Sequence, residues 1–239
     1  MRRLAFLGLA AAAAGCGRRR FRERSFVTRG TGPPVELAVL GDSLALGTGA
    51  SDSSRGFAFD LYRPLDITRP GSEISNYAIG GSTAADVLRL QVGRLRERRA
   101  DCVIVCVGGN DVARGIDPQD FAQTYAALVR AIRQTVPGAS IVLLGVPDVS
   151  ISPLFADRAG LVRALALADD RAVRAAARAP RVWYVDLFAI TRGPRAATDF
   201  LSADRFHPSD SGHALIAIAA RPALDQAIAS RFARSGSAR

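Results

Sequence analysis

The chain has 239 residues, of which 49% are hydrophobic, and its formal net charge is +10. This length and composition are sufficient for one domain with a full hydrophobic core. A net positive charge is consistent with binding to nucleic acid or to an anionic membrane surface, or simply with a well-solvated protein surface. The sequence has no zinc-ligand spacing, RNA-binding aromatic signature or groove-reading basic helix, so we expect no nucleic-acid partner.

The first 16 residues have the pattern of an export signal. Arg2 and Arg3 precede an apolar run over residues 4–14, which is too short to cross a bilayer but suits a signal peptide. The run ends in Ala13-Ala14-Gly15-Cys16, which resembles a bacterial lipobox with alanine where leucine is usual. We predict a signal peptide over residues 1–16, Cys16 as lipidation site, and an exported bacterial protein, secreted or anchored at the cell envelope. An ordinary secretory signal or an uncleaved anchor is the alternative.

Residues 17–34 have the composition of a basic flexible linker. Arginines cluster between Arg18 and Arg24, and the segment ends in Gly30-Thr31-Gly32-Pro33-Pro34. Lipid on Cys16 would place these arginines beside the membrane and attract anionic headgroups. We expect either such a peripheral membrane contact or a linker without a partner.

From residue 35 onward, short apolar runs alternate with helical patterns. The apolar runs predict five buried strands, over 35–40, 73–77, 102–107, 141–145 and 182–186. Helical spacing covers 117–136, 158–178 and 209–220. The first helix has Asp117 and Pro118 at its start, and we expect Pro222 to kink or end the last one. This alternation predicts one α/β domain over residues 35–230, with a parallel sheet of about five strands covered on both faces, and a tail over 231–239.

Two of the three cysteines, Cys102 and Cys106, lie on the third predicted strand. Residues four apart on a strand stand about 13 Å apart, which is too far for a disulfide. We therefore expect both to be buried thiols that pack as small hydrophobes.

Polar or glycine-rich segments follow four of these runs. They are Gly41-Asp42-Ser43-Leu44, Gly80-Gly81-Ser82-Thr83, Gly108-Gly109-Asn110-Asp111 and, past a longer loop, Asp204-Arg205-Phe206-His207. Because the carboxyl ends of parallel strands meet at one edge of the sheet, we expect the segments to lie together. A serine, a histidine, an acid and oxyanion donors are what acyl transfer through a nucleophile requires.

The residues of these segments, and a few others near them in the chain, also have structural interpretations. A serine after a strand is a common helix N-cap, and the first segment is not a G-x-S-x-G elbow because Ala45 replaces the second glycine. We expect His213 to be structural, Asp42 to brace its loop, Asp111 to support Asn110, and Asp186 to be a candidate brace for the pocket.

Together and in order, the four segments resemble the conserved blocks of SGNH hydrolases, the GDSL esterase and lipase family. The resemblance covers the predicted domain and implies a flavodoxin-like three-layer α/β/α fold. It implies Ser43 as nucleophile, with Asp204 and His207 as its partners. It also implies an oxyanion hole made by three groups, the backbone N–H of Ser43, the backbone N–H of Gly81 (favoured over adjacent Gly80) and the side chain of Asn110.

We therefore expect a serine esterase that hydrolyses a small-molecule, lipid or carbohydrate ester through an acyl-enzyme on Ser43, with no metal or organic cofactor. Acyl-chain length and alcohol are not implied, because a fold does not determine a substrate. Two alternatives stay open, an acyltransferase of the cell envelope and a non-catalytic envelope-binding lipoprotein.

Overall fold

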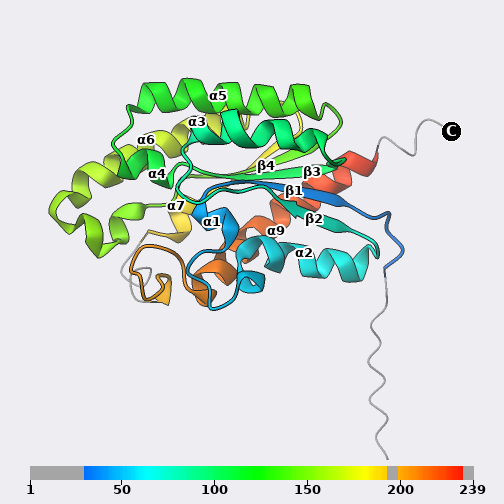
Figure 1. The fold of residues 1–239 in the computed structure, drawn as a ribbon, viewed down its shortest axis with the longest axis horizontal. Helices are drawn as coiled ribbons and strands as arrows, with labels where there is room; N and C mark the ends of the chain where they lie inside the picture. Colours follow the sequence, from blue (N-terminus) through cyan, green and yellow to red (C-terminus); the bar gives the residue numbers. More distant parts are fainter. Residues whose placement is uncertain (1–29, 193–198, 234–239) are drawn as a thin grey trace, which may run out of the picture.

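The computed structural model describes residues 30–192 and 199–233, and its centre is a five-stranded sheet (Figure 1). The strands are β1 (Glu36–Gly41), β2 (Glu73–Asn76), β3 (Cys102–Cys106), β4 (Ser140–Leu144) and β5 (Val182–Val185). Every pairing is parallel, and the order is β2-β1-β3-β4-β5. This is the flavodoxin-like order, in which the chain direction across the sheet reverses between β1 and β3. The predicted fold class and all five strands are confirmed.

Helices cover both faces of the sheet, because successive strand side chains point to opposite sides. On the upper face in Figure 1 lie α3 (Ala84–Asp86), α4 (Gly109–Ala113), α5 (Pro118–Thr135) and α6 (Ala159–Ala176). On the lower face lie α1 (Ser43–Leu46), α2 (Phe57–Thr68) and α9 (Asp210–Ala233). A short α7 (Leu187–Ile190) follows β5. Leu40 and Val105 belong to the upper core, and Val39 and Ile104 to the lower.

Short helical turns complete the connections. Four are 3-10 turns: η1 (Ser53–Arg55), η3 (Val92–Arg96), η4 (Val149–Ile151) and η5 (Pro153–Arg158). The fifth, η2 (Val87–Gln91), is a π-helical turn between α3 and η3.

The predicted long helices are confirmed, except for the end of the last one. Asp117 caps α5 by accepting the Gln119 N–H at 2.8 Å, and α6 lies within its predicted range. The prediction that Pro222 kinks or ends the last helix is wrong about the end, because α9 continues through it, and the kink stays a prediction. A proline inside a helix costs about 3 kcal/mol. Beyond it, Leu224 and Ile228 are buried in the lower core, which is worth roughly 1.5–3 kcal/mol each.

Cys102 and Cys106 are buried and free, as expected. Burial raises the pKa of the Cys102 thiol to about 12. Both therefore serve as core packing groups.

The predicted signal peptide, Cys16 and the arginine cluster lie outside the described residues. The end of the predicted linker, from Gly30 onward, is held against α2, since the Gly30 N–H donates to the Ile67 carbonyl at 3.2 Å and Arg69 donates to the Pro33 carbonyl at 3.0 Å. Within the described ranges, none of the helices is both long and apolar enough to span a bilayer.

Candidate active site

Ser43 lies at the point where β1 ends and α1 begins. The chain passes close to β3 here, and a Cβ on Gly41 would lie 2.1 Å from the Cys106 carbonyl oxygen. Asp42 is the N-cap of α1 and accepts the Leu44 N–H at 2.9 Å. The sharp bend after β1 therefore needs both the glycine and the aspartate, and it leaves the Ser43 hydroxyl at the carboxyl edge of the sheet.

The structure brings Ser43, His207 and Asp204 into one chain of contacts. His207 Nε2 lies 2.8 Å from Ser43 Oγ, and His207 Nδ1 lies 2.7 Å from Asp204 Oδ2. The three predicted residues are thus joined within hydrogen-bond distance, although 164 positions separate the serine from the histidine.

A tight turn holds the acid and the histidine together. Asp204 Oδ1 accepts the backbone N–H groups of Phe206 at 2.9 Å and His207 at 2.8 Å, and the Ser202 hydroxyl at 2.8 Å. Burial alone would raise the pKa of Asp204, but hydrogen bonds from the His207 ring and these donors hold it well below its usual range. Asp204 is therefore a carboxylate throughout the neutral pH range. Arg205, in this turn, has a φ of 61°, in the left-handed region.

Further aromatic and polar contacts hold this turn and the His207 ring in place. The Phe206 ring meets the imidazole edge-on, with centroids 4.9 Å apart, and Phe155 packs on Phe206 at 6.0 Å. The Ser152 hydroxyl donates to the Arg205 carbonyl at 2.7 Å. On the other side, a Cβ on Gly49 would lie 2.7 Å from His207 Cβ, so only glycine fits there.

Asn110 approaches the same edge from β3, on α4. Its Nδ2 donates to the Ser82 carbonyl at 3.1 Å and to Asp42 Oδ2 at 3.3 Å. Gly108 makes this approach possible with a φ of 131°, since a Cβ there would lie 2.6 Å from a Val146 methyl carbon.

The second segment contacts the site through Ser82 rather than through Gly81 itself. Gly81 has a φ of 77°, and its carbonyl accepts a hydrogen bond from Arg114 at 2.7 Å. Ser43, Asn110 and His207 line the cavity beside the nucleophile, whereas Gly81 is not among its lining residues. The Gly81 N–H as an oxyanion donor stays a prediction.

Two buried aspartates lie behind these segments. Burial raises the pKa of Asp42 to about 7, and the negative charge of Asp111 adds to this effect. Burial likewise raises the pKa of Asp111 to about 6. We expected Asp111 to support Asn110, but its carboxylate instead accepts the Ala84 N–H at 3.1 Å and so anchors the loop that contains Gly81.

His213 and Asp186 have structural contacts. His213 Nδ1 accepts the Phe57 N–H at 3.3 Å, and its Nε2 lies 3.1 Å from the Thr48 carbonyl. Desolvation lowers the pKa of His213, which favours the neutral ring that these two bonds require. Asp186 caps α7 by accepting the Ala189 N–H at 2.8 Å and does not itself line the cavity, so its part as a brace for the pocket stays a prediction.

Sequence reasoning missed Gln91. This fully buried side chain accepts the Gly41 N–H and donates to the Gly41 carbonyl, both at 2.8 Å, and so completes the end of β1 beside the nucleophile. Nothing in its neighbourhood marks it, because a glutamine among arginines and leucines is typical of an exposed helix face.

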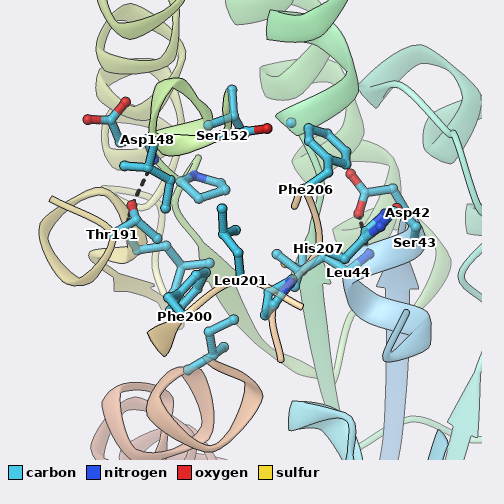
Figure 2. A pocket seen from close by; sticks show the side chains of 18 of the residues that line it. Asp42, Ser43, Leu44, Asp148, Ser152, Thr191, Phe200, Leu201, Phe206 and His207 are labelled. Carbon is cyan, nitrogen blue, oxygen red and sulfur yellow. Dashed lines mark hydrogen bonds between the residues drawn. The ribbon is translucent and has the colours of Figure 1, made fainter. Parts of the chain in front are cut away.

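The contacts converge on a cavity of about 50 Å³. Figure 2 shows Ser43 and His207 on one side and Thr191 and Phe200 across from them, with Leu201 between. Most of the wall is apolar, from Leu44, Val107, Pro147, Val149, Ile151, Leu187, Phe200, Leu201, Phe206, Pro208 and Ile216. In the part of the chain that the structure describes, no cluster of three or more histidine, cysteine or acidic side chains is placed to hold a metal ion.

Two known proteins are similar to this chain in sequence. Esterase TesA of Pseudomonas aeruginosa is 32% identical over 110 residues, a match that covers 46% of this chain and 53% of that protein. GDSL-like esterase Rv1075c of Mycobacterium tuberculosis is 31% identical over 224 residues, covering 83% of this chain and 69% of that protein. The chain thus spans about half the length of the first relative and about two thirds of the second.

Solved structures give the same result at the level of the fold. The crystal structure of TesA superposes with a TM-score of 0.66 and 25% identity, over 80% of this chain and 99% of that one. A two-domain esterase active on acetylated mannans superposes with a TM-score of 0.58 and 22% identity, over 82% of this chain and 50% of that one. The model of the GDSL-like lipase/acylhydrolase family matches residues 39–215. The chain therefore belongs to the GDSL-like lipase/acylhydrolase family.

Proposed function

We propose that this protein is a serine esterase that hydrolyses carboxylic esters through an acyl-enzyme on Ser43. The observation that carries the proposal is the line of contacts from Asp204 through His207 to the Ser43 hydroxyl, at 2.7 and 2.8 Å. A hydroxyl is a weak nucleophile until a base within hydrogen-bond reach accepts its proton. Family membership and two relatives named esterases support the same reaction.

Each group then has a defined role in the reaction. Neutral His207 accepts the Ser43 proton at Nε2 while Ser43 Oγ forms a bond to the ester carbonyl carbon. His207 then gives that proton to the departing alcohol as the ester C–O bond breaks. A water molecule, deprotonated by the same histidine, attacks the acyl-enzyme and releases the acid. Asp204 keeps the Nδ1 proton in place and stabilises the imidazolium.

The negative charge on the carbonyl oxygen needs donors at the sheet edge. Candidates are the backbone N–H groups of Ser43 and Gly81 and the side-chain amide of Asn110, which come from three segments that meet there. Donors already in place at this position stabilise the transition state without reorganisation and are usually a large part of catalysis.

The cavity beside Ser43 suits a short acyl chain. Its walls are mostly apolar, as an acyl group requires, and its volume is about 50 Å³. An apolar cavity of about 150 Å³ holds a six-carbon benzene ring. By that scale, we propose a preference for acyl groups of about two to four carbons, with the alcohol part outside the cavity.

A panel of esters from acetyl to palmitoyl, including O-acetylated sugars and lysophospholipids, tests both the role of Ser43 and the preference for short acyl chains. We expect the highest kcat/KM at the short end and loss of turnover by several orders of magnitude in Ser43→Ala. Ser54→Ala, an exposed serine in η1, is the matched control and should keep full activity. Activity that survives in Ser43→Ala refutes the mechanism.

The same assays separate the two alternative functions. Transfer of the acyl group to an added alcohol in preference to water would favour the acyltransferase, and no turnover of any activated ester would favour a binding protein.

We also propose that the protein is exported and anchored through lipid on Cys16, from the apolar run and Ala13-Ala14-Gly15-Cys16. Two or more acyl chains would hold it stably at a membrane, where one would not. Cys16→Ser should move the expressed protein from the detergent phase to the aqueous phase. Unchanged partitioning would contradict lipidation of Cys16 and leave a secretory signal or another anchor.

A further inference from the structure

The side-chain nitrogen of Asn110, Nδ2, donates to two acceptor oxygen atoms. One is the Ser82 carbonyl at 3.1 Å, and the other is Asp42 Oδ2 at 3.3 Å. An amide has one donating and one accepting end, and the two ends have nearly the same shape. If Asn110 were turned over, Oδ1 would face two oxygen atoms and both contacts would become repulsive. The two acceptors therefore select one orientation of the amide.

We propose that Asp42 is a positioning residue that acts through Asn110, keeping the NH2 end of the amide rather than its carbonyl oxygen on the Ser43 side of the site. The NH2 group has two hydrogens, and the longer of its two contacts, to Asp42 at 3.3 Å, is the one given up when an N–H donates to the oxyanion. Asp42 immediately precedes Ser43 in the chain, so its contact with Nδ2 places this end of the amide beside the nucleophile. The inference rests on the proposed function, because it concerns how the oxyanion donor is oriented.

The second oxygen of Asp42 determines what a substitution would do. Oδ1 accepts the Leu44 N–H at 2.9 Å as the N-cap of α1, so an acceptor is required at that position. In Asp42→Asn the amide oxygen would take the Oδ1 position, and the NH2 group would therefore face Asn110 Nδ2. Two donors cannot pair, so the Asp42 position now favours the turned-over amide and only the Ser82 carbonyl still favours the donating one. Asn110 then presents its carbonyl oxygen toward the reacting carbonyl in part of the molecules.

If Asp42 only braces the loop, the Asp42 variants should rank differently in activity. Asn is the closest replacement in shape, and it removes a buried charge, so a bracing role predicts that Asp42→Asn is the mildest change. Asp42→Ser keeps an N-cap acceptor but is too short to reach Asn110. Positioning therefore predicts the reverse order, with Asp42→Ser more active than Asp42→Asn.

The test is a double-mutant cycle with the ester that the wild type turns over best. We expect Asp42→Asn to lower kcat at least tenfold, with the roughly 100- to 1,000-fold loss of one oxyanion donor as the upper limit, and KM changed less than threefold. In an Asn110→Ala background the same substitution should change kcat by less than threefold. Additive losses in the cycle, or Asp42→Asn more active than Asp42→Ser, would overturn the inference.

Two further measurements separate this result from loss of the fold or of the proposed function. Asp52→Asn is the matched control, because Asp52 is an exposed N-cap that accepts the Ser54 N–H at 2.8 Å, and its kcat should equal that of the wild type. Thermal unfolding of Asp42→Asn should give a Tm no lower than that of the wild type. Failure of the proposed function appears instead in Ser43→Ala, as retained activity, whatever the cycle shows.

Discussion

At the scale of single residues, the site depends on which side chains donate and which accept. Asp204 shows this most clearly. Its Oδ1 accepts from three donors in its own turn, and only Oδ2 is left for His207. The carboxylate is therefore oriented before the histidine contacts it, and the histidine is held in the tautomer with its proton on Nδ1.

This arrangement predicts a severe effect of Asp204→Asn. The amide oxygen would take the Oδ1 position, so the NH2 group would face His207 Nδ1 and force the ring proton onto Nε2, next to Ser43. Such a ring cannot accept the serine proton, and kcat should fall by about 10⁴-fold, as in the triad it resembles. Steady-state kinetics measures this, and a loss below tenfold would contradict a tautomer-setting role for Asp204.

A second residue-scale prediction concerns Asp169, which lies on α6 away from the cavity. Both of its carboxylate oxygens are buried and lack a hydrogen-bond partner among the described residues. Burial raises the pKa of Asp169 to about 7, with the charges of Asp111 and Asp117 adding to the effect. Because the folded-state pKa exceeds the unfolded value, its contribution to stability is complete below about pH 4 and is lost as pH rises through about 7.

Asp169→Asn should therefore stabilise the protein more at pH 8.5 than at pH 5, since it removes only the cost of burying the charge. Thermal unfolding of both proteins at the two pH values measures the difference. An equal shift in Tm at both values would show that Asp169 does not titrate in this range.

At the scale of elements, packing overrides local propensity in α9. The helix passes Pro222, which has no N–H for the Ile218 carbonyl four residues earlier, and continues for another three turns to Ala233. Leu224, Ala227 and Ile228 are buried in the lower core beyond the proline. The sequence predicts a kink or an end because a proline acts locally, whereas the compensating contacts come from α2 and the sheet.

Two substitutions test this balance. Pro222→Ala restores the N–H and should raise the free energy of unfolding, by at most about 3 kcal/mol. Leu224→Ala should lower it by roughly 2–5 kcal/mol, because it leaves a cavity in the core. Denaturant unfolding measures both, and a destabilising Pro222→Ala would mean that the proline fits α9 without cost.

At the scale of the whole molecule, the sheet order explains why distant segments form one site. The chain reverses its direction across the sheet between β1 and β3, and Ser43 and Asn110 follow these two strands. The segment after α7 brings His207 to the same edge. The sequence predicts that these segments lie together, because the strands and the segments that follow them are visible as local patterns. The carboxyl ends of parallel strands share one edge of the sheet.

Other parts of the site could not be predicted, because they depend on side-chain partners that the fold brings together. Gln91 pairs with Gly41 across 50 positions, and Asp42 contacts Asn110 across 68. No local pattern distinguishes Gln91 from an exposed polar residue, and the segment that contains Asp42 does not show that its side chain contacts Asn110. The sequence predicts only that the Asp42 carboxylate braces its loop, and its contact with Asn110 forms because β1 and β3 lie side by side.

The central claim is that Ser43 carries the acyl group, and intact-protein mass measurement with peptide mapping tests it most directly. A serine-reactive organophosphonate should add one adduct to the wild type, located on the peptide that contains Ser43, and none to Ser43→Ala. Asp204→Asn, which keeps the serine but lacks a working base, should be labelled far more slowly. Equal labelling of the wild type and Ser43→Ala, or an adduct mapped to another residue, would contradict the account.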